Sequence, residues 1–86
     1  MSRIEELADA IGNLASKIDE VVAETAGAGA ETEDMSTNAQ ALGATNMTDG
    51  LAQVKDQLDA LSQTLRGASE RAGEIQALTL TVGDGT

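Results

Sequence analysis

The sequence predicts an all-α protein, an antiparallel helical hairpin of the coiled-coil type. Three observations predict this fold class. The 86 residues contain no proline and are rich in Ala, Leu, Glu and Gln, which favour helices. Two long stretches place apolar residues alternately three and four positions apart, the spacing of one face of a helix. A turn signal centred on Gly43 separates the two stretches. Within a single domain we expect a helix over 3–42, a turn over 43–46, a helix over 47–77 and an extended tail over 78–86.

The first predicted helix carries a heptad pattern, with positions named a to g and apolar residues at a and d. The most strongly apolar part of this pattern consists of Ile4, Leu7, Ile11, Leu14, Ile18 and Val21. Ser2 and Glu5 have the spacing of a capping box, which predicts a helix start near Arg3. The same frame continues to Leu42 across a weak segment at 27–31, where each glycine costs about 1 kcal/mol. We expect one continuous helix; the alternative is a break at 27–31, with Thr32 capping a further helix.

The second predicted helix follows a short turn. Gly43 is suited to end the first helix, and Asn46 or Thr48 to cap the second. The a and d positions of the second helix are Leu51, Val54, Leu58, Leu61, Leu65, Ala68, Ala72 and Ile75. Beyond them, residues 79–82 alternate between threonine and apolar residues, a pattern typical of a strand. We expect this tail to lie extended along the helices, with a short strand as the alternative.

The two apolar stripes also predict a register and an interface. Pairing each a position with a facing d position gives pairs whose residue numbers add to 93, such as Ala28 with Leu65. This register leaves the N-terminal end of the first stripe beyond the second helix, and an exposed apolar patch normally marks an interface. Either the tail covers this patch or another chain does; we expect another chain, itself or a helical paralogue, completing a four-helix bundle. The predicted interface residues are Ile4, Leu7, Ile11, Leu14, Leu78, Leu80 and Val82, and the predicted turn residues are Gly43 and Asn46.

Composition excludes several function classes. The chain has 15 acidic and 5 basic residues, a net charge of −10, so it lacks the basic footprint of a nucleic-acid-binding protein. No apolar stretch approaches the roughly 20 residues of a membrane span. Without cysteine or histidine it has no disulfide, no thiolate metal site and no imidazole base. The acidic residues lie mostly on outward positions, and no nucleophile has an activating neighbour. We therefore expect no enzyme activity, cofactor or metal, and a protein that is cytoplasmic or secreted without a general secretory signal peptide.

An acidic hairpin of this length, with its bend near residue 43, resembles the Trp-X-Gly family of small type VII secretion substrates. The resemblance implies a dimeric four-helix assembly with a motif at the bend. Here the bend reads Ala41-Leu42-Gly43, so the glycine is present and the tryptophan is not. The family's C-terminal export signal needs a tyrosine, and the chain has none. The composition and the bend are also similar to small helical proteins of actinobacteria.

Two function classes follow from these observations. The first is a helical interaction protein, related in architecture to secreted hairpins and acting as a homodimer or heterodimer. The second is a structural subunit that self-assembles into a larger polymer through its N-terminal apolar stripe and its β-prone tail.

Overall fold

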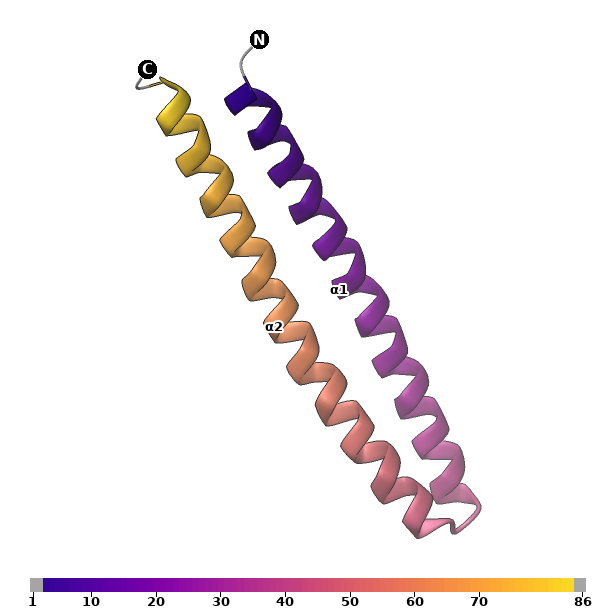
Figure 1. The fold of residues 1–86 in the computed structure, drawn as a ribbon. Helices are drawn as coiled ribbons and strands as arrows, with labels where there is room; N and C mark the ends of the chain where they lie inside the picture. The colour runs from indigo at the N-terminus through magenta and orange to yellow at the C-terminus, as the bar shows by residue number, and fades with distance from the viewer. Residues whose placement is uncertain (1–2, 85–86) are drawn as a thin grey trace. The chain divides into compact units, whose positions relative to one another are not determined.

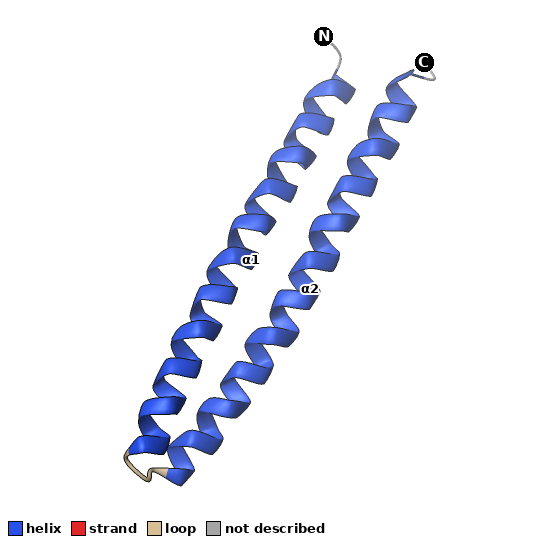
Figure 2. Ribbon diagram, turned by 180° about the vertical axis from the view of Figure 1, so that it is seen from behind, coloured by secondary structure: helices blue, strands red, loops and turns tan. Residues whose placement is uncertain are grey.

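The computed structural model describes residues 3–84, and almost all of them are helical. Helix α1 spans Arg3–Ala41 and helix α2 spans Thr45–Asp84. The helices run antiparallel and pack against each other, which confirms the predicted all-α hairpin (Figures 1 and 2). The chain divides into two compact units that each contain a part of both helices. We call residues 1–21 with 65–86 the terminal unit, and residues 22–64 the turn unit.

Helix α1 passes through residues 27–31 without interruption. The alternative with a helix break at this segment is therefore wrong. Thr32, the cap residue of that alternative, lies inside the helix and donates its hydroxyl to the carbonyl oxygen of Ala28 at 2.8 Å. The predicted capping box includes Ser2, which lies outside the described residues.

Gly43 ends α1 in a Schellman motif. Its φ of 73° lies in the left-handed region that glycine adopts without strain. The Gly43 amide donates to Gln40 O at 3.0 Å, and the Ala44 amide donates to Ala39 O at 2.9 Å, the two bonds that define this motif. The predicted turn was too long at its end, because α2 already begins at Thr45. Asn46 therefore lies in the first turn of α2, and the carbonyl of Ala44 accepts the first bond from the Thr48 amide.

Substitution of two glycines by alanine is expected to change stability in opposite directions. A Cβ at Gly27 would meet nothing within 4 Å, so Gly27→Ala gains helix propensity and should stabilise the chain by about 0.5–1 kcal/mol. Gly43→Ala would force a side chain into the left-handed region and should destabilise by about 1–2 kcal/mol. Urea unfolding of both variants measures the two changes. If both substitutions changed the free energy of unfolding in the same direction, either the continuous α1 or the glycine-dependent turn would be contradicted.

The C-terminal tail is helical, which corrects the prediction of an extended segment over 78–86. Helix α2 continues to Asp84, and residues 85–86 lie outside the described residues. Thr79 and Thr81 donate their hydroxyls to the carbonyls of Ile75 and Ala77, at 2.8 and 3.0 Å, as threonines inside helices do. The strand pattern failed because β propensity is weak and depends on context, and here α1 supplies a helix-packing surface. A Cβ on Gly83 would lie 2.9 Å from Cγ2 of Ile4, so this glycine allows close contact with α1.

The register differs from the predicted one by about six residues. The Gln76 side-chain amide donates to the carbonyl of Ala8 at 3.1 Å, and Ser69 donates to Asp19 at 2.6 Å. In the turn unit, Lys55 lies against Gly29 and Glu33. The residue numbers of these contacting pairs add to between 84 and 88, and not to 93. The tight turn places α2 alongside α1 sooner than predicted, so the N-terminal end of α1 has no overhang.

The seam between the helices uses heptad positions a and e, and not a and d. In α1 the buried or half-buried residues include Ile4, Ala8, Ile11, Ala15, Ile18, Val22, Thr25, Gly29, Thr32, Ser36 and Ala39. In α2 they include Thr48, Leu51, Lys55, Leu58, Ser62, Leu65, Ser69, Ala72, Gln76, Thr79 and Gly83. Most e positions carry small residues, which let the two backbones approach closely. The most buried apolar side chains of the described residues are accordingly alanines, and no large side chain is fully buried.

Candidate functional site: an exposed apolar face

Large apolar residues at the heptad d positions, which include several that were predicted to fill the seam, are exposed instead. The d positions of α1 carry Leu7, Leu14, Val21 and Met35, and Leu42 continues the series just beyond the end of the helix; these residues are 42–83% exposed. On α2 the corresponding positions carry Met47, Val54, Leu61, Ile75 and Val82, which are 43–57% exposed. Members of each group are spaced by sevens, with Ala28 and Ala68 filling the two gaps in the series. We call these d positions the apolar face.

Within each unit, the d positions of both helices lie on the same side of the hairpin. At 100° per residue, d lies about 60° to one side of a, whereas e lies about 40° to the other side. An antiparallel pair that packs through the same two positions on both helices has local two-fold symmetry, which keeps the two d stripes on one side. In the turn unit this is seen directly, because Met35 of α1 and Leu42 just after it line one shallow groove with Met47 and Leu51 of α2.

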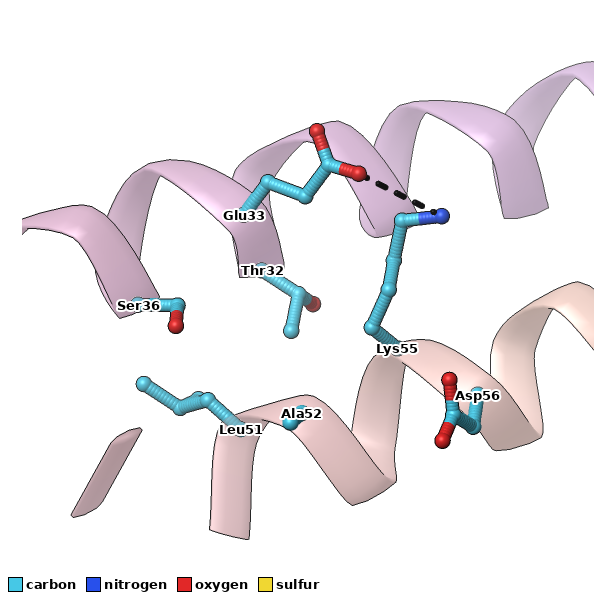
Figure 3. Close-up of a pocket in the computed structure, with 7 residues that line it drawn as sticks. All are labelled: Thr32, Glu33, Ser36, Leu51, Ala52, Lys55 and Asp56. Atoms are coloured by element: carbon cyan, nitrogen blue, oxygen red, sulfur yellow. Dashed lines mark ion pairs between the residues drawn. The ribbon is translucent and has the colours of Figure 1, made fainter. Parts of the chain in front are cut away.

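The other side of the seam is polar. In the turn unit, the Lys55 ammonium lies 2.6 Å from Asp59 and 3.5 Å from Glu33 of α1. Figure 3 shows the Lys55 side chain crossing from α2 towards Glu33. The hydrogen bond to Asp59 raises the pKa of Lys55, and the charges of both carboxylates act in the same direction against partial desolvation. Because the pKa is raised, this contribution to stability is present at neutral pH and is lost only as pH rises through the folded-state pKa.

The predicted interface residues divide between four places. Ile4 and Ile11 lie half-buried in the seam, where Ile4 lies close to Gly83. Three others, Leu7, Leu14 and Val82, lie on the apolar face. Leu78 is 63% exposed at position g beside this face. Leu80 is 44% exposed at position b, on the polar side of the seam.

Sequence reasoning missed most of the apolar face on α2 and in the turn unit. Val54, Leu61 and Ile75 were assigned to the seam because they continue the alternating three- and four-residue spacing of a and d positions. The signal that places them outside is the short or flexible residue one position further along α2. Gln76, Ser62 and Lys55 follow them at position e, where short or flexible side chains permit close helix contact.

The part of the chain that the structure describes holds no group of three or more metal-binding side chains. Over the same residues, neither helix has an apolar stretch that is long enough to cross a membrane. Comparisons with protein families, curated proteins and solved structures found no match to this chain. The candidate site therefore has to be interpreted from its own geometry.

Proposed function

We propose that this chain is a non-enzymatic interaction protein that packs its apolar face against the helices of another chain, as a homodimer or a heterodimer. The observation that carries the proposal is the apolar face itself. In each of the two units, five large apolar side chains at d positions are at least 42% exposed. No charged residue occupies any of the d positions in either helix. Apolar patches of this extent normally mark interfaces.

The surface area of the chain supports the same conclusion. The single chain exposes 6170 Å². A compact monomer of 8.8 kDa is expected to expose about 4,800 Å². The excess of about 1,400 Å² is larger than the roughly 800 Å² that each partner buries in a standard stable interface. Association through the apolar face would remove such an excess from water, whereas the alanine-lined seam alone buries little.

Glutamate substitutions on the apolar face test the proposal. Leu14→Glu combined with Leu61→Glu places a charge on each helix of this face and should abolish association. The matched control is Leu80→Glu, which changes an equally exposed leucine on the polar side of the seam and should leave association intact. Sedimentation equilibrium at tens of micromolar measures the result. A wild-type chain that stays monomeric, or a double variant that associates like wild type, would contradict the proposal.

The finer assignment, a secreted hairpin like those of the Trp-X-Gly family, is proposed on length and architecture. Gly43 occupies the bend as the family's glycine does, while the tryptophan and the tyrosine signal are missing. The gene neighbourhood tests it, since an adjacent secretion ATPase would support export. The prediction of a polymer-forming subunit depended on an overhanging N-terminal segment and a β-prone tail. In the described residues, segment 79–82 is helical and α2 reaches the level of Ile4, so no observation favours that second class.

A further inference from the structure

Charges beside the apolar face differ in sign between the two units. Position g flanks each d position on the side away from the seam. In the terminal unit, the charged residues at g are Arg3, Lys17 and Arg71. In the turn unit they are Glu24 and Glu31. All five side chains are exposed, so a chain that docks on the apolar face meets cations in one unit and carboxylates in the other.

The apolar residues alone allow two ways of docking a second copy face to face. In the aligned arrangement, α1 lies on α2 of the second copy, and Leu14 meets Ile75 of the partner subunit. In the reversed arrangement, α1 lies antiparallel on α1 of the second copy. Val21 then meets its own equivalent at the two-fold axis, and Leu14 meets Ala28 of the partner subunit. Both arrangements bring d positions of α1 against d positions of the partner subunit, so the apolar contacts alone do not choose between them.

The flanking charges choose between the arrangements. The Asp19–Ser69 hydrogen bond places Lys17 and Arg71 at matching levels of the terminal unit. The aligned arrangement therefore brings Lys17 beside Arg71 of the partner subunit, twice by symmetry. The reversed arrangement, centred on Val21, instead brings Lys17 beside Glu24 of the partner subunit, also twice. Like charges in contact are unfavourable and opposite charges are favourable, so the reversed arrangement is preferred.

We propose that the apolar face is covered by a second copy of this chain in the reversed arrangement, with α1 antiparallel to α1 and Lys17 paired reciprocally with Glu24 of the partner subunit. The proposal rests on the proposed function and specifies its partner. The two copies of α1 are then related by a two-fold axis at Val21.

Charge reversal separates the two arrangements, because Lys17→Glu has opposite effects in them. In the reversed arrangement it places two pairs of carboxylates side by side. Their repulsion should raise the dimer Kd by about 3- to 30-fold. The double variant Lys17→Glu with Glu24→Lys restores both pairs and should return Kd to near the wild-type value. Arg66→Glu is the matched control, because it makes the same change in net charge at an exposed b position. Sedimentation equilibrium gives the Kd values, and circular dichroism checks that each variant is helical.

Cysteine cross-linking gives an independent measurement, since the natural chain has no cysteine. Val21→Cys should form an intermolecular disulfide readily under mild oxidation, because the two-fold axis brings the two copies of this residue together. Leu7→Cys is the matched control on the same face and should cross-link poorly.

Weakening by Lys17→Glu, restoration by the double variant and selective cross-linking at position 21 together support the proposal. A dimer that Lys17→Glu tightens, or that does not cross-link at position 21, overturns the reversed arrangement. Provided that the glutamates at positions 14 and 61 still dissociate that dimer, the proposed function stands. A wild-type chain that remains monomeric overturns both.

Discussion

The thermal unfolding midpoint of this protein is expected to rise by about 3–6 °C for each tenfold increase in chain concentration. If unfolding is coupled to dissociation of a dimer, a tenfold higher chain concentration raises the free energy of unfolding by about 1.4 kcal/mol per dimer. This is about 0.7 kcal/mol per chain. A domain of this size shifts its midpoint by about 4–8 °C per kcal/mol. The described residues bury no large side chain within one chain, so folding and association should be coupled.

The variant with glutamates at positions 14 and 61 should unfold at a lower temperature that does not depend on concentration. Burying each leucine contributes roughly 1.5–3 kcal/mol, and two are replaced in each chain. That loss is a large part of a typical stability of about 5–15 kcal/mol. Leu80→Glu should keep the concentration dependence of the wild type. Circular dichroism melts at about 5 and 50 μM provide the comparison, and a concentration-independent wild-type midpoint would contradict coupled folding.

Ala8→Leu is expected to destabilise the hairpin by about 1–3 kcal/mol, because it overpacks the seam. Ala8 is only 1% exposed, and its carbonyl accepts the Gln76 side-chain amide at 3.1 Å. A leucine at this position would push α2 away and disturb that hydrogen bond. Chemical denaturation at fixed chain concentration measures the change.

The matched control is Ala23→Leu, at an exposed f position of the same helix. Alanine and leucine have similar helix propensities, so this change should shift stability by less than about 0.5 kcal/mol. The comparison also distinguishes the two seams, since position 8 would lie beside the contact if a and d formed it. Equal effects of the two substitutions would mean that the a and e seam is wrong.

Several features of the fold were predictable from local sequence. The absence of proline and the unbroken heptad frame predicted continuous helicity through Gly27 and Gly29, and α1 is continuous there. Gly43 predicted the turn, because only a residue that tolerates positive φ closes a Schellman motif without strain. The heptad pattern predicted an apolar stripe on each helix, and position a of both stripes lies in the seam.

Tertiary packing decided which neighbour of position a joins the seam. Side-chain size favoured position d, where Leu14 and Leu61 gain most from burial. The helices instead approach through Ala8, Gly29 and Ala72, because small side chains allow a close, well-packed contact over the short reach of the Gly43 turn. The same choice set the register, kept residues 79–84 helical against the N-terminal end of α1, and left the larger side chains facing outwards. The sequence of each helix is compatible with a seam through positions a and d and with a seam through positions a and e. The choice between them depends on whether close backbone approach or burial of large side chains contributes more, and this is decided only when the two helices pack.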